Sequence, residues 1–321
     1  MRAIITGSHG FIGSHLVDAL VDSGVECVCI DDMSTGLLQN LADARMAAEK
    51  RGLYFRTMVC DAGKGVWRHI HEADVVFHLA AVVGVERVMR YPGLVLQKMH
   101  ETSKEVVNCC VEHNVRLLIT STSEVYGRST DCPFREDQDC HIGPPTAARW
   151  SYALVKLMDE FMAMDAWERL GLQATVVRLF NTVGPRQSCM HGMVLPRFCH
   201  QALNGERLTI HGDGSQSRCF AHVKDVVKCL LMLSQKEFAG EVFNVGSTEE
   251  VTILKLAAEV QKAVVEPFRC GTGVEYVDGR STDMARRVPD VSKLRSAIGF
   301  VPNTPLPTIV RDVIEGMRRE V

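Results

Sequence analysis

Residues 2–13 read Arg-Ala-Ile-Ile-Thr-Gly-Ser-His-Gly-Phe-Ile-Gly, an apolar run followed by three glycines. Arg2–Thr6 has the composition of a buried strand, and the residues from Phe11 to about Ser23 have the apolar spacing of a helix. The glycines between them follow the spacing G-x-x-G-x-x-G. A strand, a glycine-rich turn and a helix in this order predict the first βα unit of a parallel sheet.

The glycine spacing also predicts a dinucleotide site. Glycine permits the tight turn, the close approach of the backbone to a pyrophosphate and the close packing of helix on strand. The first turn of the helix then offers unpaired N–H groups and the positive end of its dipole to the phosphates. The cofactor-binding candidates at this turn are Gly7, Gly10, Phe11, Ile12 and Gly13.

An acidic pair follows the second expected strand. Glu26–Ile30 is apolar and strand-like, and it leads into Asp31 and Asp32. A carboxylate at this point can bind both hydroxyls of the adenosine ribose and would repel a 2′-phosphate. The pair therefore predicts NAD rather than NADP. The alternative is a structural turn with a solvated acidic pair.

Further strands repeat the pattern. Leu53–Val59 leads to Asp61, a candidate for the adenine edge, and Asp74–Ala81 is again apolar. The last residues of this strand would let the backbone lie against the cofactor, and they are Leu79, Ala80 and Ala81. The loop that follows carries Glu86 and Arg87, which are candidates for contact with a substrate.

Strands continue to alternate with helices along the first half of the chain. Two long helical patterns and two more strands follow, at Pro92–His113, Trp150–Leu170, Arg116–Thr120 and Gln173–Leu179. This alternation predicts an α/β fold, a Rossmann-type doubly wound parallel sheet with a smaller α/β substrate-binding domain. We expect the NAD-binding domain over 1–181, with return segments near 220–247, and the nucleotide-sugar-binding domain over 182–321.

A tyrosine and a lysine share one face of the second long helix. Tyr152 and Lys156 are four residues apart. Thr122 and Glu124 lie just past the carboxyl end of a strand, where open α/β sheets place ligands. A lysine ammonium beside a phenol favours the phenolate, so we expect the pKa of Tyr152 to be lowered, which suits proton removal from a sugar hydroxyl. The alternative is a surface pair that shares a helix face by chance.

The composition is that of a globular protein, with 321 residues, 46% hydrophobic and 23% charged, and a formal charge of -3. Because the sequence carries no excess of positive charge, nucleic acid is not expected as a partner. Because there is no apolar run of about 18 residues and no signal peptide, neither a membrane span nor export is expected. We therefore expect a cytoplasmic protein.

Twelve cysteines raise the question of a metal site or disulfides. No C-x-x-C pair occurs, and Cys189 and Cys199 lack two further ligands nearby. Cys109 and Cys110 lie in an apolar run, where a free thiol behaves as a small hydrophobe. Neither a metal nor disulfides are expected, and free thiols fit a reducing compartment.

Several motifs occur together: G-x-x-G-x-x-G at 7–13, S-T-S-E-V-Y-G at 121–127, Y-x-x-x-K at 152–156, R-L-F-N-x-x-G-P-R at 178–186 and G-D-G-S-Q-S-R at 212–218. In this combination the chain resembles the extended short-chain dehydrogenases/reductases of the NAD-dependent epimerase/dehydratase family, over nearly its whole length. The resemblance implies NAD as cofactor and a UDP-sugar as substrate. It also implies that the sugar C4 hydroxyl is oxidised first, with Thr122, Tyr152 and Lys156 as catalytic residues.

The resemblance also assigns the nucleotide site. It places Asn181, Arg186 and Arg218 on the diphosphate and ribose. It places residues 194–198 and 208–210 around the uracil, with the candidates Val194, Arg197, Leu208 and Ile210. The alternative for each arginine is a surface ion pair.

Within that family, three features are similar to UDP-glucuronate decarboxylases of the UDP-xylose synthase type. They are Thr-Ser-Glu at 122–124, Arg149 three residues before the tyrosine, and Arg-Arg-Val-Pro-Asp at 286–290, where Arg287 matches an active-site arginine. An arginine that reaches a sugar makes sense if the sugar carries a carboxylate. The resemblance therefore implies that Glu124 and Arg287 are catalytic and that Ser123, Arg149 and Arg287 contact the substrate. The Asp-Glu pair of sugar dehydratases is absent.

The implied reaction is oxidation at C4, loss of CO2 from the resulting β-keto acid and return of the hydride. It yields UDP-xylose, or its 4-keto form if the ketone escapes first. A UDP-sugar 4-epimerase, acting on UDP-glucose/galactose or UDP-glucuronate/galacturonate, is the main alternative, because the loop 82–90 is more similar to epimerase-type members. A catalytically idle NAD-binding regulator is a third, which the intact Thr122, Tyr152 and Lys156 disfavour.

One departure from the family pattern lies on the first long helix. The usual Asn-x-x-Gly-Thr is replaced, with Met99, Thr102 and Ser103 at the matching positions. The family usually dimerises through its two long helices. A homodimer through Pro92–His113 and Trp150–Leu170 is therefore expected.

Overall fold

The computed structural model describes the chain except for residues 83–84, 190–191, 266–272, 279–285 and 320–321. The described residues form two compact units. Unit 1 comprises Met1–Gly127, Cys140–Leu179 and Val227–Phe243, and unit 2 comprises Arg128–Asp139, Phe180–Val226 and Asn244–Val321. Residues 128–139 group with unit 2, although they were expected in the first domain.

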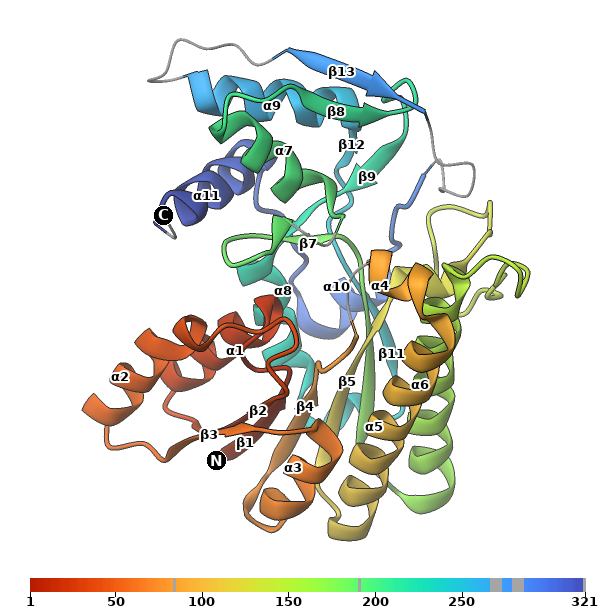
Figure 1. The fold of residues 1–321 in the computed structure, drawn as a ribbon. Helices are drawn as coiled ribbons and strands as arrows, with labels where there is room; N and C mark the ends of the chain where they lie inside the picture. The colour runs from red at the N-terminus through yellow and green to blue at the C-terminus, as the bar shows by residue number, and fades with distance from the viewer. Residues whose placement is uncertain (83–84, 190–191, 266–272, 279–285, 320–321) are drawn as a thin grey trace. The chain divides into compact units, whose positions relative to one another are not determined.

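A seven-stranded sheet forms the centre of unit 1 (Figure 1). Its strand order is β11-β6-β5-β4-β1-β2-β3, and every ladder from β6 to β3 is parallel. The strands are β1 (Arg2–Thr6), β2 (Glu26–Asp31), β3 (Phe55–Val59), β4 (Val75–His78), β5 (Arg116–Thr122), β6 (Ala174–Leu179) and β11 (Val242–Val245). The expected doubly wound sheet is confirmed. Its direction of winding reverses between β1 and β4, which is where such sheets bind ligands.

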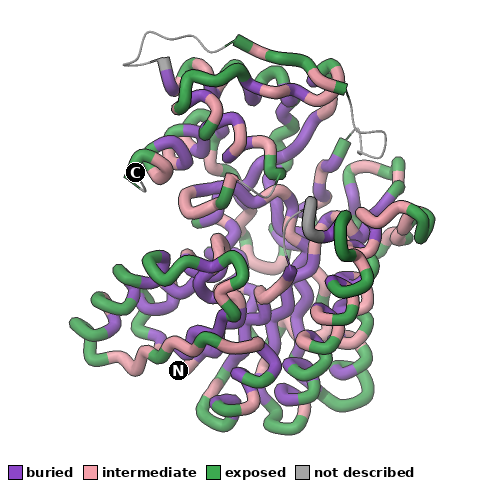
Figure 2. Tube along the Cα trace, viewed as in Figure 1, coloured by how far each residue is buried: buried purple, intermediate pink, exposed green. Residues whose placement is uncertain are grey.

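Helices cover both faces of this sheet. α3 (Ala62–His69), α5 (Pro92–His113) and α6 (Trp150–Leu170) lie on one face, and α1 (Phe11–Asp22) and α2 (Ala42–Lys50) lie on the other (Figure 1). α5 and α6 have the expected bounds and pack side by side. Apolar side chains of α3, α5 and α6 form a buried core with those of the strands. Figure 2 colours the buried residues purple along the chain.

The long helices begin and end at residues suited to helix termini. Pro92 occupies the first turn of α5, where the missing N–H of proline costs no intrahelical hydrogen bond. Asn114 ends α5 with φ of 52°, and Gly171 ends α6 with φ of 74°. Both are left-handed C-terminal caps, which asparagine and glycine adopt most readily.

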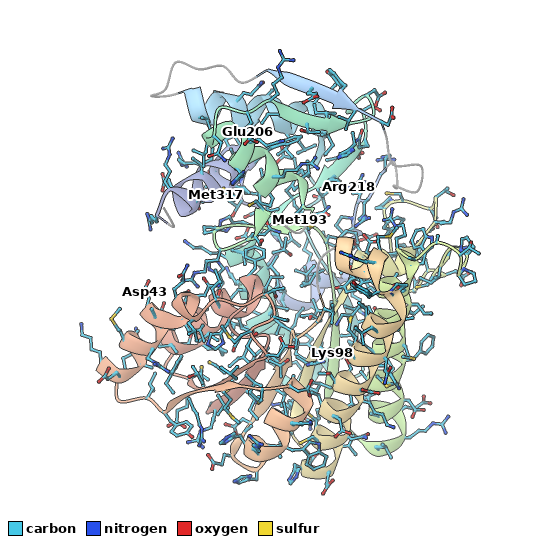
Figure 3. The ribbon with its side chains drawn as sticks, in the orientation of Figure 1. Asp43, Lys98, Met193, Glu206, Arg218 and Met317 are labelled. Carbon is cyan, nitrogen blue, oxygen red and sulfur yellow. The ribbon has the colours of Figure 1, made fainter. Side chains whose placement is uncertain are left out.

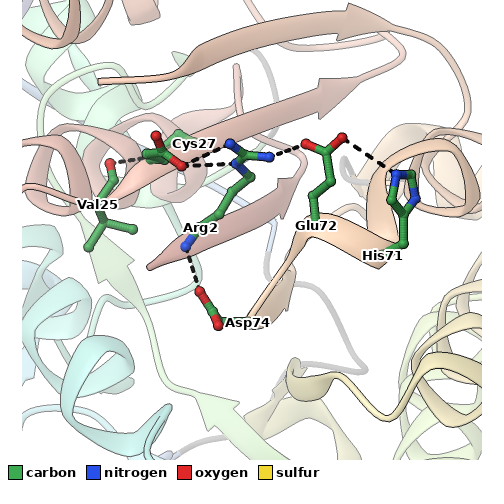
Figure 4. Close-up of polar contacts among 7 residues, drawn as sticks. Arg2, Val25, Cys27, His71, Glu72 and Asp74 are labelled. Atoms are coloured by element: carbon green, nitrogen blue, oxygen red, sulfur yellow. Dashed lines mark hydrogen bonds and ion pairs between the residues drawn. The ribbon is translucent and has the colours of Figure 1, made fainter. Parts of the chain in front are cut away.

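Arg2, at the start of β1, joins three segments at the amino ends of the strands (Figure 4). Its backbone N–H donates to Asp74 at 2.7 Å, and its guanidinium pairs with Glu26 and Glu72. Glu72 also contacts His71 at 3.4 Å. Because these side chains are partly exposed, the cluster aligns the strands but adds little free energy.

A buried ion pair joins α6 to β6. The Arg178 guanidinium donates to Glu160 at 2.8 and 3.0 Å and to the hydroxyl of Tyr126 at 2.9 Å. Ser121 donates to the same carboxylate. The Glu160 and Arg178 side chains are each 6% exposed. Removing one partner would therefore leave the other charge buried and uncompensated.

We expect Glu160→Leu to lower the free energy of unfolding by about 3–5 kcal/mol, because the Arg178 guanidinium would remain buried without its carboxylate. Urea denaturation followed by circular dichroism measures this change. Asp165→Ala is the control on the same helix, since the Asp165–Arg169 pair is exposed and should contribute less than about 1 kcal/mol. Equal effects of the two variants would contradict the role given to Glu160.

Unit 2 has a core of its own. α7 (Val194–Leu203), α9 (Ile253–Val265) and α11 (Leu306–Arg319) pack together around apolar side chains. Three strand pairs complete the unit, namely β7 (Thr182–Val183) with β10 (Ala221–His222), β8 (Leu208–His211) with β13 (Val274–Val277), and β9 (Ser217–Cys219) with β12 (Glu250–Thr252). The first two pairs are parallel and the third is antiparallel.

Three shorter helices and a 3-10 turn lie between these elements in the sequence. They are α4 (Val85–Arg90), α8 (Val223–Leu233), α10 (Ser292–Ile298) and η3 (Ser123–Tyr126). Glu86 and Arg87, predicted to contact a substrate, belong to α4, and their side chains lie outside the described residues. Within the described ranges, no helix combines the length and apolar character that a membrane crossing needs.

The cysteines that the structure describes are free thiols. Burial raises the pKa of Cys109 and of Cys199 to about 12, with nearby carboxylates adding to the effect at Cys109. These thiols are therefore protonated and unreactive at neutral pH. Across the described part of the chain, no three His, Cys, Asp or Glu side chains are grouped to hold a metal ion.

Candidate active site

The glycine-rich turn after β1 closes tightly against the end of β4. Gly7 has φ of +70°, and a Cβ there would lie 2.9 Å from the backbone nitrogen of Ala80. A Cβ on Gly13 would overlap the Gly7 carbonyl. Gly10 is the N-cap of α1, and no side chain caps that end of the helix. The turn is thus a backbone cradle at an uncapped helix N-terminus, which fits a pyrophosphate.

The acidic pair lies at the end of β2, beside that turn. The Asp31 carboxylate accepts hydrogen bonds from the backbone N–H groups of His9 at 2.9 Å and Met33 at 2.8 Å, so it anchors the turn. Asp32 pairs with Lys98 of α5, labelled in Figure 3, at 2.5 Å. Burial opposes the charged form of Asp32, but hydrogen bonds, led by that of Lys98, outweigh it and lower its pKa to about 2. Sequence reasoning missed Lys98.

Asp61 and the end of β4 are the other predicted cofactor contacts. Asp61 caps α3 by accepting a backbone hydrogen bond at 3.1 Å, and it also accepts one from Thr102 at 3.2 Å. Ala80, within the predicted segment Leu79–Ala81, donates its N–H to the hydroxyl of Thr6 at 3.2 Å. These contacts order the loops that follow β1, β3 and β4, at the carboxyl ends of the strands.

We expect Gly13→Ala to weaken NAD binding at least about tenfold. Alanine favours a helix more than glycine does, but here its methyl group would push the turn away from the cradle. Isothermal titration with NAD measures the change. Gly93→Ala, in the first turn of α5, is the control because a Cβ there meets nothing within 4 Å. Equal NAD affinity of both variants would argue against the cradle.

Lys156, on α6, is a buried ammonium only 2% exposed. It donates to the carbonyl oxygen of Thr120 at 2.8 Å and lies 3.5 Å from the carboxylate of Asp159, one turn along the helix. Tyr152 lies one turn earlier on the same face, partly buried against an apolar cluster that includes Met99. The helix therefore aligns a phenol, an ammonium and a carboxylate.

The expectation that the pKa of Tyr152 is lowered was wrong. Burial raises the pKa of Tyr152, and the negative charges of Glu124 and Asp159 raise it further. The Lys156 ammonium does not offset these effects, and it pairs with Asp159 and donates to the Thr120 carbonyl. Tyr152 is therefore a neutral phenol at neutral pH.

Thr122, Ser123 and Glu124 lie where β5 passes into η3. The Thr122 hydroxyl oxygen accepts a hydrogen bond from the Glu124 N–H at 3.2 Å, so its own hydrogen can be donated to a ligand. Glu124 pairs with Arg149 at 3.2 Å, and both side chains are partly exposed. Ser123 is buried. Unit 1 thus brings the predicted residues of β5, η3 and α6 together, since the charge of Glu124 acts on Tyr152.

Three polar residues behind this group were missed by sequence reasoning, namely Asp159, Ser103 and His78. His78 contacts the hydroxyl of Thr6 at 2.8 Å and that of Ser103 at 3.2 Å. Burial, aided by the charge of Lys156, lowers the pKa of His78 to about 3, so the ring is neutral. The three-residue spacing of Lys156 and Asp159 was the only signal in the sequence.

In unit 2, the segment 286–290 carries two neighbouring arginines that differ in their exposure to solvent. Arg286 is exposed and binds Glu250 through two hydrogen bonds, at 2.8 and 2.9 Å. These bonds lower the pKa of Glu250 to about 2. Arg287 is only 7% exposed. Main-chain hydrogen bonds to Phe134 hold the segment in place.

The predicted diphosphate and ribose contacts also lie in unit 2. Asn181 donates to the carbonyl oxygen of Cys219 at 3.2 Å. Arg218, labelled in Figure 3, is buried and donates to the carbonyl of Ser217 at 2.7 Å. Arg186 has φ of 65°, a left-handed conformation that is uncommon for arginine. The fold thus holds the main chain around these residues in defined conformations.

The predicted uracil contacts surround β8. Arg197 of α7 donates to the carbonyl of Thr209 at 3.0 Å. Leu208 and Ile210 are fully buried in the core of unit 2, and Val194 packs against that core. A contact of Leu208 or Ile210 with a base would therefore come from the main chain and not from the side chains.

Comparison with known proteins places this arrangement among nucleotide-sugar enzymes. Residues 3–246 match the model of the NAD dependent epimerase/dehydratase family. The chain is 32% identical to a UDP-N-acetyl-alpha-D-glucosaminuronate decarboxylase of Bacillus cytotoxicus, over 99% of this chain and 98% of that one. It is 31% identical to UDP-glucuronic acid decarboxylase 1 of Arabidopsis thaliana, over 97% of this chain and 69% of the plant protein.

Among solved structures, the chain is similar to a UDP-N-acetylglucosamine 4-epimerase from Methanobrevibacter ruminantium M1, which was solved with UDP-N-acetylmuramic acid. The TM-score is 0.89 and the identity 28%, over 100% of this chain and 99% of the epimerase. Decarboxylases are thus among the relatives in sequence, and an epimerase is among those in structure.

Proposed function

We propose that this chain, which belongs to the NAD-dependent epimerase/dehydratase family, decarboxylates a UDP-uronic acid. The proposed substrate is UDP-glucuronate or its 2-acetamido analogue, after the two decarboxylases above. The glycine-rich turn and Asp31 would hold NAD, which would supply the acceptor for the hydride of the sugar C4 and its donor in the return step.

The observation that carries this proposal is the Glu124–Arg149 pair beside Tyr152. A guanidinium that is already matched to a carboxylate in a partly exposed position can bind a second carboxylate on an incoming sugar. A neutral sugar offers it no such partner. Buried Arg287 is the second guanidinium proposed for the sugar carboxylate.

Each residue has a defined task in the proposed mechanism. Tyr152 takes the proton of the C4 hydroxyl in its phenolate form, which the positive charge of a bound NAD would favour, and Thr122 donates a hydrogen bond to the same oxygen. The ketone at C4 then lies β to the carboxylate, so the electrons of the C5–C6 bond pass into the carbonyl as CO2 leaves. Arg287 binds the carboxylate until CO2 leaves. Glu124 controls the delivery of the proton that C5 takes up. Tyr152 finally returns its proton to the C4 oxygen, which gives a UDP-pentose.

Incubation with NAD and each UDP-uronic acid tests the proposal. We expect CO2 release with at least one of UDP-glucuronate and UDP-N-acetylglucosaminuronate, with a UDP-pentose or its 4-keto form detected by proton NMR. The rates with the two compounds identify the substituent accepted at C2. Without CO2 from either compound, the proposal fails.

A UDP-sugar 4-epimerase is the second candidate, favoured by the likeness to the archaeal epimerase structure. An epimerase needs the same Thr122, Tyr152 and Lys156 but leaves the C5–C6 bond intact. A galacto-configured product without CO2 in the same experiment would support it.

We also propose that the protein is a homodimer through α5 and α6. These helices expose large apolar side chains, among them Leu94, Leu154 and Phe161. Exposed apolar groups on adjacent helices favour burial against a second copy. Phe161→Lys should shift the mass measured by light scattering towards the monomer, and Met46→Lys, an exposed residue on α2, should not.

We propose a cytoplasmic location because the described cysteines are free thiols. The described cysteines, many of them buried, carry no disulfide, as a reducing compartment would maintain them. Fractionation of the native host with an antibody against the chain tests this.

A further inference from the structure

The Asp32–Lys98 ion pair joins two segments of unit 1 that are far apart in the chain. Asp32 directly follows β2, and Lys98 lies on α5 (Figure 3). The Lys98 ammonium donates to one carboxylate oxygen of Asp32 at 2.5 Å, while the other oxygen accepts the N–H of Ser34 at 3.0 Å. The two side chains are 41% and 32% exposed. Because so exposed a pair adds little to the free energy of unfolding, stability does not account for its position.

A second contact ties the same face of α5 to the end of the neighbouring strand. Thr102 lies one turn after Lys98, and its hydroxyl donates to the Asp61 carboxylate at 3.2 Å. Asp61 lies just beyond β3, which pairs with β2 in the sheet. One face of α5 is therefore bound to the segments after β2 and β3, which are the two segments predicted to contact the adenosine of NAD.

The two neighbouring carboxylates at the end of β2 have different partners. Asp31 is only 7% exposed, and its two oxygens accept the backbone N–H groups of His9 and Met33. Asp32 instead binds the side-chain cation of Lys98. The end of β2 thus carries two carboxylates and one ammonium. Loss of the Asp32 carboxylate would leave one of each and would leave the ammonium without this partner.

We propose that Lys98 determines the choice between NAD and NADP, as the cation that can bind a ribose 2′-phosphate and that Asp32 keeps occupied in the wild-type chain. A phosphate and a carboxylate accept the same charge-assisted hydrogen bonds from an ammonium. A 2′-phosphate would have to displace the Asp32 carboxylate from Lys98 and would be repelled by its charge. NAD carries a hydroxyl in place of that phosphate and requires no such exchange. The inference concerns the cofactor alone and holds whichever sugar the enzyme converts.

The direction of the effect follows from these contacts. Asp32→Ala removes the group that competes for the ammonium, so the affinity for NADP should rise at least about tenfold, the scale of one charge-assisted hydrogen bond. The affinity for NAD should change less than about threefold, because Asp31 and the glycine-rich turn keep their contacts. The ratio of the two dissociation constants is the quantity to compare, since a general loosening of the fold affects both dinucleotides.

A second substitution separates the freed ammonium from a mere loss of repulsion. If only the charge of Asp32 excluded the phosphate, the gain in NADP affinity would persist when Lys98 is also replaced. We expect instead that Lys98→Ala in the Asp32→Ala background abolishes the gain, and that Lys98→Arg in the same background keeps it. Asp22→Ala is the matched control, because Asp22 forms an exposed pair with Arg51 at the end of α1, before β2 begins. It should leave the ratio unchanged.

Isothermal titration of each full-length variant with NAD and with NADP, at one fixed salt concentration, tests the inference without any turnover. A gain in NADP affinity in Asp32→Ala that disappears in the double alanine variant supports it. No gain in Asp32→Ala, or an equal gain with and without Lys98, overturns it. Asp32→Asn removes the charge but keeps an acceptor for the Ser34 N–H, so it gives the same comparison if alanine loosens the turn. The result is independent of whether a UDP-uronic acid is converted.

Discussion

Tyr152→Phe should lower kcat by about 10²–10⁴-fold, the contribution of one well-placed general acid–base group. The substitution removes only the hydroxyl that would take the C4 proton, and the ring keeps its packing in the cluster with Met99. Because the glycine-rich cradle and Asp31 are untouched, NAD should still bind with nearly the wild-type affinity. Product formation from the UDP-uronic acid and NAD titration measure the two effects.

Tyr91→Phe is the matched control, since Tyr91 is exposed at the start of α5 and lies outside the proposed machinery. It should leave kcat within a factor of about two. Unchanged activity of Tyr152→Phe would remove Tyr152 from the mechanism. Loss of NAD binding together with activity would instead assign Tyr152 to the cofactor site.

Arg287→Ala should lower kcat/KM for a UDP-uronic acid by about 10²-fold, the scale of losing a buried guanidinium–carboxylate contact. Arg287→Lys should recover only part of it, because an ammonium cannot bind a carboxylate through two parallel hydrogen bonds. Steady-state kinetics of the two variants measures this. Their urea midpoints show whether the folded state is intact.

Arg286→Ala is the neighbouring control. The Arg286 guanidinium is exposed and bound to Glu250, so its loss should change kcat/KM by less than about threefold. If Arg286→Ala were the more damaging change, the two arginines would have to exchange roles. If both variants were harmless, the sugar would not be held by this segment.

The parts predicted correctly from the sequence are those with a local signal. The turn after β1 is encoded in glycine spacing, and α5 and α6 are encoded in apolar periodicity that ends at Asn114 and Gly171. The sheet follows from the alternation of these elements, since parallel strands need helical crossovers. The elements that carry Thr122, Glu124 and Tyr152 lie together because β5 and η3 contact α6.

The parts that were missed depend on burial, which a sequence does not display. The spacing of Lys156 and Asp159 is visible, but an exposed pair of this spacing would have no effect on a tyrosine. The pKa of Tyr152 is raised rather than lowered because Tyr152 itself is desolvated, and the charges of Glu124 and Asp159 add to this effect. The contact of Asp32 with Lys98 joins residues far apart in the chain and had no local signal.

The segment 128–139 was assigned to the wrong unit for a similar reason. It follows β5 directly in sequence, so continuity placed it in the first domain. In the structure, Phe134 bonds to the main chain of Val288 and Asp290, and Asn244 donates to the Phe134 carbonyl at 2.9 Å. Such pairing across more than 100 residues appears only once the chain is folded.

A UDP-uronic acid carrying deuterium at C4, converted in ordinary water, tests the central claim most directly. If Tyr152 opens a redox cycle at C4 before CO2 leaves, the UDP-pentose should keep deuterium at C4 and gain its new hydrogen at C5 from water, and turnover should show a primary isotope effect. CO2 release with neither an isotope effect nor deuterium retained at C4 would contradict oxidation and return of the hydride at that carbon.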